Sequence, residues 1–154
     1  MASNRAKVSS GQWIDTTGGD MIELGVGFRS TMSDMGIFRV TVEIENPLRP
    51  GERRSVSSVL VDTGAESSWL PAEVLDALGI ERYQRLRFRQ ASGAIVERWI
   101  GLAFVHAGGR RASDDVVFAE PGDLTLLGAR SLEGLNLRVD SRAKELVDAG
   151  PILA

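Results

Sequence analysis

The sequence predicts a mainly β domain whose sheet closes into a barrel-like form, with one or two short helices. Short segments in which apolar and polar residues alternate recur along the chain, as in residues 38–45. Turn residues separate these segments, for example at 107–110, and only residues 71–79 combine helical spacing with defined ends. Many short strands with few helices are typical of closed, mainly β folds.

The first predicted strand spans residues 38–45, where strict alternation favours a half-buried strand. Its inward-facing residues are Phe38, Val40, Val42 and Ile44. Two prolines and a glycine make residues 46–54 a solvated loop, and residues 55–61 form the next strand. Residues 71–79 follow as a short helix, because Pro71 suits a first turn and Gly79 a C-terminal stop.

A β-hairpin and several shorter elements complete the prediction. Leu86 and Phe88 alternate with arginines, residues 91–94 form a turn, and residues 95–105 return as a long strand. Further short strands are expected at 116–118, 124–127, 135–139 and 146–147, with a short helix beginning at 128–132.

Length and composition limit the classes of function. A chain of 154 residues, 43% hydrophobic and 25% charged, suits one globular domain. Its polar start predicts a mobile segment over residues 1–20 and a single domain over 21–154. There is no cysteine, and the single histidine, His106, is expected at the surface. These counts exclude thiolate nucleophiles, cysteine zinc sites and multi-histidine cages, so we expect no metal and no cofactor.

Charge and hydropathy narrow the partners and the compartment. A net charge of −3 gives no general reason to expect a nucleic-acid partner. The first residues lack the apolar core of a signal peptide, and no segment approaches the length of a membrane span. We therefore expect a soluble, cytoplasmic protein that binds neither nucleic acid nor membranes.

The motif that indicates a function is Asp62-Thr63-Gly64, which follows the apolar run of residues 59–61. A strand that delivers an acid onto a tight glycine turn suits a carboxylate that activates water. Two carboxylates that share a site cannot both ionise, so one acts as base while the protonated one polarises the substrate carbonyl. The motif therefore predicts peptide hydrolysis by an aspartyl dyad. The alternative for the tripeptide alone is an ordinary β-turn.

The number of copies of the motif predicts the oligomeric state. Asp62-Thr63-Gly64 occurs once, so one chain supplies one carboxylate. A dyad then requires a second copy of the chain, with a twofold axis between two Asp62 side chains. The sequence therefore predicts a homodimer that acts on a peptide or protein substrate.

With these motifs in this order, the chain resembles the retropepsin-like aspartic proteases, single-domain enzymes of retroviruses and bacteria. The resemblance covers residues 37–147, which is most of the expected domain, and the ending over 132–147 is similar to the bacterial branch. The segments that carry it are the loop 59–65, the helix-like 70–80, the hairpin tip 91–94 at the place of the flap, and the apolar-apolar-glycine run 124–129.

The resemblance implies an acid-protease fold, a homodimer and endopeptidase activity on extended peptides. Asp62 is then catalytic, and the Thr63 hydroxyl hydrogen-bonds to Thr63 of the second chain. Gly64 contacts the substrate backbone, and Ala65 completes the catalytic loop. The residues expected to form the substrate-binding flap are Ala91, Ser92, Gly93 and Ala94. The substrate would lie between flap and dyad and pair like an added strand.

The chain departs from the retroviral pattern in the contact that braces the dimer. Retroviral members pair an Asp after the small residue with an Arg directly after the later glycine. This chain has Glu66 and Ala129 at those places, with Arg130 one step on. A Glu66–Arg130 pair is the available substitute, and residues 140–154 are an alternative dimer edge.

Other residues have both a structural and a functional interpretation. The arginines of residues 81–111 fit a solvated hairpin face or a preference for acidic substrates. Trp69 and Trp99 fit core packing or substrate pockets. Asp114 and Asp115 would face opposite ways on one strand, which disfavours a second dyad or a metal site there.

The leading prediction is a retropepsin-type aspartic endopeptidase, active as a homodimer through Asp62. The alternative is a protease-fold dimerisation or peptide-binding module that does not hydrolyse its ligand. A third interpretation, a β-barrel with a chance motif, predicts a monomer in which Asp62 is not paired across an axis.

Overall fold

The computed structural model describes residues 37–154. The predictions of a mobile segment over 1–20 and of a domain that begins at residue 21 lie outside the described residues. The described chain divides into two compact units. The larger unit contains Thr41–Leu137 and Gly150–Ala154, and the smaller contains Arg138–Ala149 with residues 37–40.

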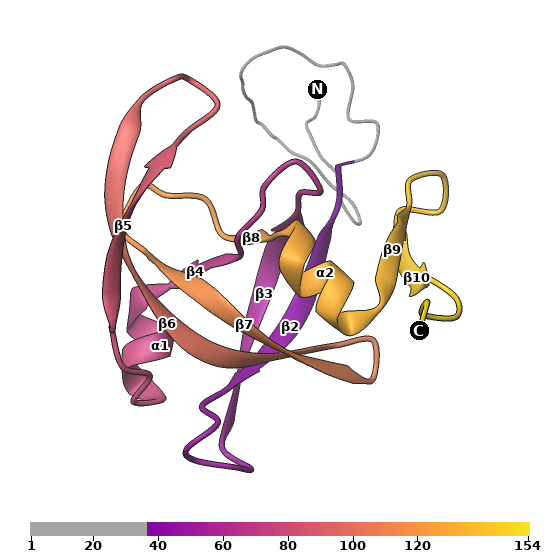
Figure 1. Cartoon of the computed structure of the whole chain (residues 1–154), viewed down its shortest axis with the longest axis horizontal. Helices are drawn as coiled ribbons and strands as arrows, with labels where there is room; N and C mark the ends of the chain where they lie inside the picture. Colours follow the sequence, from indigo (N-terminus) through magenta and orange to yellow (C-terminus); the bar gives the residue numbers. More distant parts are fainter. Residues whose placement is uncertain (1–36) are drawn as a thin grey trace. The chain divides into compact units, whose positions relative to one another are not determined.

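The structure is mainly β, as predicted, and is built around a seven-stranded sheet (Figure 1). Its strands are β2 (Arg39–Glu45), β3 (Arg53–Val61), β4 (Trp69–Pro71), β5 (Gln84–Arg89), β6 (Ile95–Ala107), β7 (Arg110–Ala119) and β8 (Leu126–Leu127). They follow the order β2-β3-β8-β4-β7-β6-β5, and β2 also pairs with β6. The sheet is therefore ring-like, with β5 attached outside the ring through β6.

Strand β6 holds the ring together because it is long enough to pair in three places. Its first half pairs with β5, from Ile95 to Ile100, and its second half pairs with β7, from Ile100 to Ala107. Phe104 to His106 pair in addition with β2. The predicted hairpin over residues 86–105 is thus confirmed.

Two short helices accompany the sheet, α1 (Ala72–Ala77) and α2 (Ala129–Leu135). Helix α1 follows directly from β4, and after its C-cap Leu78 comes Gly79, whose φ of +73° suits glycine. The helix predicted from residue 128 is confirmed, but α2 continues through Leu135, so the next strand begins two residues later than predicted. Neither helix of the described chain is long and apolar enough to cross a membrane.

The predicted final strand pair is also present. Strands β9 (Leu137–Asp140) and β10 (Glu145–Asp148) form a separate two-stranded sheet. Their connection turns at Asp140, whose Oδ1 accepts the amide N–H groups of Arg142 and Ala143 at 3.1 and 3.0 Å. A carboxylate that accepts from amides two and three residues on is a common way to close a turn.

The core explains why residues 116–119 are all apolar instead of alternating with polar residues. In β7, Val116 and Phe118 lie on one face and Val117 and Ala119 on the other, and all of them are buried. Both faces of β7 are covered, because Val117 and Ala119 pack with Trp69, Ile100 and Leu126, while Val116 and Phe118 are buried on the other face. A strand covered on both faces is continuously apolar, which is why the run over 116–118 gives a strong signal.

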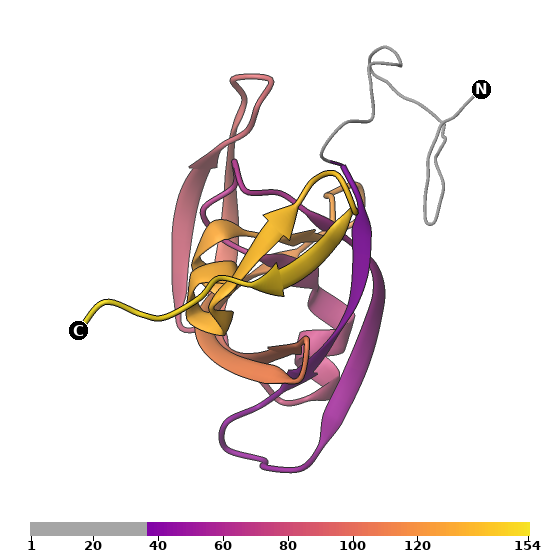
Figure 2. The ribbon, with the colours of Figure 1, turned by 90° about the vertical axis from the view of Figure 1, so that its right-hand side faces the viewer.

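Two loops lie at the same end of the larger unit. The tip of the β5–β6 hairpin and the loop between β3 and β4 share one end in both perpendicular views (Figures 1 and 2). The β2–β3 connection lies at the opposite end in both views. The loop that carries Asp62 is therefore at the end of the larger unit where the hairpin projects.

Candidate active site

Asp62 lies where β3 ends, held between the sheet and a tight turn. Its amide N–H donates to the Leu127 carbonyl at 3.0 Å, and the Leu60 N–H donates to the Thr125 carbonyl at 3.0 Å. These bonds continue the parallel register in which Val61 lies opposite Leu127. Strand β8 thus fixes the backbone from which the Asp62 carboxylate leaves the sheet.

The residues after Asp62 form the expected glycine turn. The Gly64 N–H donates to Asp62 Oδ1 at 2.9 Å, and the Ala65 N–H donates to the Asp62 carbonyl at 3.2 Å. A Cβ atom at Gly64 would lie 3.2 Å from Asp62 Oδ1. Asp62 is half-buried, while Thr63 and Gly64 are exposed. The turn therefore presents the carboxylate at the surface in a fixed orientation, close to Gly64, where a side chain would crowd it.

The segment behind this turn packs on Gly128, the glycine of the apolar-apolar-glycine run. A Cβ at Gly128 would lie 2.5 Å from the Ser67 carbonyl oxygen and 2.9 Å from that of Ala65. The next two amides donate into the same loop, from Ala129 to the Ala65 carbonyl at 2.7 Å and from Arg130 to the Glu66 carbonyl at 3.1 Å. Only glycine allows this approach.

A buried polar network adjoins the same loop. The Ser68 and Ser131 hydroxyl oxygens lie 2.6 Å apart, and the Gly128 N–H donates to Ser68 Oγ at 2.9 Å. Ser131 Oγ donates to Asp114 Oδ2 at 2.7 Å, and Arg130 Nε donates to Asp114 Oδ1 at 3.3 Å. Burial raises the pKa of the Asp114 carboxyl, and the bonds from Ser131 and Arg130 oppose that rise.

Sequence reasoning missed this network, although one signal was available. Asp114 is flanked at two-residue spacing by Ala112 and Val116, and both of these are buried. An acid in an inward-facing row requires partners, but the alternation cannot name a serine far away in the sequence. The prediction that Asp114 and Asp115 face opposite ways holds, since Asp115 accepts a hydrogen bond from the Tyr83 hydroxyl.

The Glu66–Arg130 pair is present but loose. Its closest nitrogen and oxygen atoms are 3.9 Å apart, and the Glu66 side chain is 79% exposed. Exposed pairs of this kind contribute little to stability. Arg130 is held more directly by Asp114 and by the Asp115 carbonyl at 3.3 Å.

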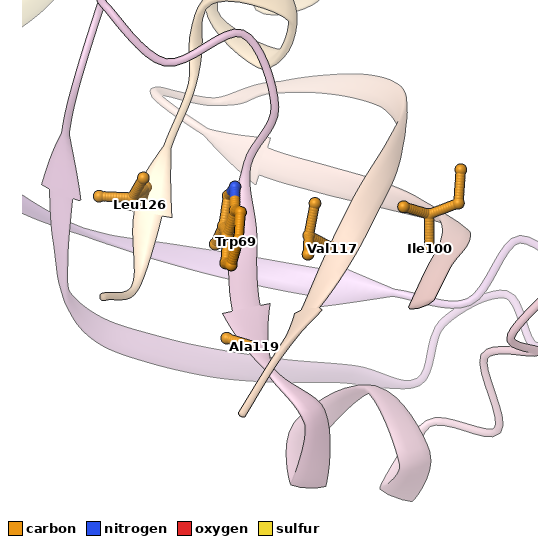
Figure 3. Close-up of a cluster of buried hydrophobic side chains, with 5 residues drawn as sticks. All are labelled: Trp69, Ile100, Val117, Ala119 and Leu126. Atoms are coloured by element: carbon orange, nitrogen blue, oxygen red, sulfur yellow. The ribbon is translucent and has the colours of Figure 1, made fainter. Parts of the chain in front are cut away.

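An apolar cluster covers the sheet face beside the Asp62 loop. We call Trp69, Ile100, Val117, Ala119 and Leu126 the Trp69 cluster; they come from β4, β6, β7 and β8 (Figure 3). Leu60 and Ala65 pack on it from the Asp62 side, and Phe88 and Val96 from the hairpin. Trp69 meets Phe88 edge-on with ring centroids 5.2 Å apart. Trp69 is therefore a core residue that joins the two halves of the candidate site.

The hairpin tip has the predicted turn. The Gln90 N–H donates to the Ala94 carbonyl and the Gly93 N–H to the Gln90 carbonyl, both at 2.8 Å. Gly93 has a φ of +92°, which other residues rarely adopt. The Ala94 N–H donates to Ser92 Oγ at 3.3 Å, and residues 91–94 are all exposed. The expected flap residues thus form an exposed, glycine-dependent tip.

Several hairpin arginines are paired within the chain, which favours their structural interpretation. Arg85 meets Glu97 at 3.3 Å across the hairpin and stacks 5.3 Å from the centre of the Trp99 ring. Arg98 binds Asp123 with two bonds, of 2.7 Å from Nε and 2.9 Å from Nη2. Arg98 holds the pKa of the Asp123 carboxyl below its usual range.

His106 was predicted to lie at the surface, but its side chain is largely buried. Its side chain is 12% exposed, and its Nε2 lies 2.6 Å from Oε1 of the buried Glu45. The Gly51 N–H bond to Glu45, followed by the His106 bond, lowers the pKa of the Glu45 carboxyl. The register that places β2 beside β6 creates this pair, and it is not readable from the sequence.

An open cavity of the larger unit lies away from Asp62. His106 also lines an open cavity of about 570 Å³ near the start of β3, whereas Asp62 lies at the far end of that strand. Within residues 37–154, no group of three or more His, Cys, Asp or Glu side chains could hold a metal ion.

Comparisons with known proteins do not assign the chain. No protein-family model matches it, and no curated protein matches it. The candidate function therefore rests on the residues and their geometry.

Proposed function

We propose that the protein is an aspartic endopeptidase of the retropepsin type, active as a homodimer with one Asp62 from each chain. The observation that carries the proposal is the setting of Asp62 at the end of β3. There the carboxylate lies on a glycine turn and is backed by the close Gly128 contact. The glycine-tipped hairpin at the same end of the unit supports it further.

The proposed chemistry requires two Asp62 carboxylates on a twofold axis. The pair shares one proton, so the ionised carboxylate takes a proton from water while the protonated one polarises the peptide carbonyl. The two carboxyl groups titrate as a unit, and neither role belongs to one chain. The exposed Thr63 and Gly64 are available to the second chain and to the substrate backbone.

In this proposal the ring-like sheet is the acid-protease fold, and the β5–β6 tip closes over an extended peptide. The peptide would gain backbone hydrogen bonds on either side, as an added strand does. The absence of cysteine suits a reducing compartment, so a cytoplasmic location belongs to the same proposal.

The test is the Asp62→Asn variant against a library of unstructured peptides. Asn keeps the size of the side chain and removes the charge, so cleavage should fall by at least about a hundredfold while the fold is retained. Cleavage by the parent protein should also be inhibited by pepstatin, which binds aspartyl dyads. Peptide products are measured by mass spectrometry, and the fold by circular dichroism.

Asp76→Asn is the matched control, because Asp76 is an exposed carboxylate on α1 that pairs only with Arg82 among the contacts described. Its cleavage rate should equal that of the parent. Equal cleavage by the Asp62→Asn variant would overturn the enzyme proposal. A dimer that binds peptides without any Asp62-dependent turnover would favour the non-hydrolytic binding module instead.

A further inference from the structure

Asp114 is a buried carboxylate that the proposed chemistry does not use. Its side chain is 4% exposed and lies on β7, behind the loop that follows Asp62. Three groups face it: the Ser131 hydroxyl and the Arg130 guanidinium from α2, and the backbone of Asp115. A buried carboxylate is costly unless it is hydrogen-bonded, so these contacts hold it in one orientation.

The charge on Asp114 fixes the direction of a chain of hydrogen bonds. An ionised carboxylate only accepts, so the Ser131 hydroxyl donates its single proton to Asp114 Oδ2. Ser131 Oγ must then accept from the Ser68 hydroxyl across their 2.6 Å contact. Ser68 Oγ in turn accepts the Gly128 N–H at 2.9 Å. The order is Gly128 N–H, Ser68 hydroxyl, Ser131 hydroxyl, Asp114 carboxylate.

This chain ends at the backbone that supports the Asp62 turn. Gly128 directly follows Leu127, whose carbonyl accepts the Asp62 N–H, and it packs on the carbonyls of Ala65 and Ser67. Ser68 closes the loop that begins at Asp62 and leads into β4. Both serines are completely buried, so water does not replace either bond.

We propose that Asp114 is a positioning residue for the catalytic loop: its carboxylate orients the Ser131 and Ser68 hydroxyls, and through Gly128 they fix the Asp62 turn. This inference rests on the proposed function, since it concerns the geometry of the same site. Asp114 does not touch the substrate and takes no proton from it.

Protonation of Asp114 should loosen the loop. A neutral carboxyl has a proton of its own to donate, so it no longer requires Ser131 to point toward it, and the direction of the chain is lost. The charged groups near Asp114 are Arg130, which faces it directly, and Glu66, which reaches only Arg130. Because burial raises the pKa of Asp114, this loss should begin at a less acidic pH than for an ordinary aspartate.

The test compares the pH profiles of kcat and KM for the parent and the Asp114→Asn variant. We expect the kcat of the variant to fall by roughly tenfold near the optimum, with KM nearly unchanged, because a misplaced reacting group costs rate. The decrease of kcat at acidic pH that results from protonation of Asp114 should be absent from the profile of the variant. Asp115→Asn is the control on the same strand, and it should leave kcat and the profile as in the parent.

Two further measurements keep the proposal open to refutation. The Gly128 amide shift in NMR spectra should titrate with Asp114 in the Asp62→Asn background and should stop titrating when Asp114→Asn is added. Ser131→Ala should reproduce the loss of kcat if Asp114→Asn does not fold. An unchanged kcat and pH profile in a folded Asp114→Asn variant, beside an inactive Asp62→Asn variant, would overturn the positioning role and leave the enzyme proposal intact.

Discussion

At the scale of single residues, the site depends on two glycines whose roles differ. At Gly64 an added Cβ would lie 3.2 Å from the Asp62 carboxylate, which is tight but adjustable. At Gly128 it would lie 2.5 Å from a backbone carbonyl, which cannot move without the loop. Gly64 therefore matters to the carboxylate itself, and Gly128 matters to the loop that presents it.

The Arg98–Asp123 pair gives a prediction about stability at the same scale. It ties β6 to the turn before β8, and the two side chains are 14% and 6% exposed. Asp123→Asn removes the carboxylate that accepts two hydrogen bonds from Arg98 and leaves Glu120, at 3.7 Å, as its remaining charged contact. The free energy of unfolding should therefore fall by about 2 kcal/mol at pH 7. Urea unfolding followed by circular dichroism measures the loss.

The pH dependence of this loss follows from the lowered pKa of Asp123. A depressed pKa stabilises the folded protein above the ordinary aspartate pKa of about 3.9, and that contribution is lost as the pH falls through the folded-state value. The difference in the free energy of unfolding between parent and variant should therefore shrink below about pH 4.

The control is Glu97→Gln, which breaks an exposed pair with Arg85 and should cost less than about 1 kcal/mol at pH 7. Equal losses for both variants would contradict the prediction.

At the scale of elements, the sequence predicted those that have a local signal. Alternation located β2 and β5, the apolar run before Asp62 located β3, the turn over 91–94 located the return into β6, and Pro71 with Gly79 located α1. Strand β4 was missed because its three residues are too few for a pattern, and it exists through its pairing with β7 and β8. The N-terminal half of β7 was missed because its inward row contains Asp114, whose side-chain partners Ser131 and Arg130 come from α2.

In the candidate site, too, features with a local sequence signal were predicted and features that depend on long-range contacts were not. Asp62 and its glycine turn were predicted because the strand, the acid and the glycine are consecutive. The Ser68–Ser131 contact joins residues 63 positions apart, so it depends on a fold that the sequence pattern does not specify. The same holds for the Glu45–His106 pair, which joins residues of β2 and β6.

The β5–β6 hairpin gives a prediction for an element. Gly93 has a φ of +92°, so Gly93→Ala strains the tip and should cost about 1 kcal/mol of hairpin stability. Because residues 91–94 are exposed, global unfolding should change little, whereas peptide cleavage should fall if the tip closes over the substrate. Gly109→Ala is the control, because Gly109 has a φ of +75° in the turn between β6 and β7 and is not part of the expected flap. Cleavage by Gly93→Ala at the parental rate would argue against a flap.

At the scale of the whole molecule, the single copy of the Asp62 motif makes the proposed activity a property of two chains. The parent protein should therefore sediment as a dimer, and dilution below the dissociation constant should abolish cleavage. Asp62→Asn chains should still assemble, because the substitution removes a charge without changing the shape of the side chain.

Mixed dimers turn this expectation into a quantitative test. When parent and Asp62→Asn chains exchange freely in equal amounts, random pairing leaves about one quarter of the dimers with two aspartates. Cleavage per parent chain should then fall to about half, because a dimer with one aspartate lacks the shared proton of the dyad. Asp76→Asn chains mixed in the same way should leave the rate per parent chain unchanged after correction for their own activity. A rate that stays proportional to the amount of parent chain in the Asp62→Asn mixture would mean that each chain works alone, and the dyad would be wrong.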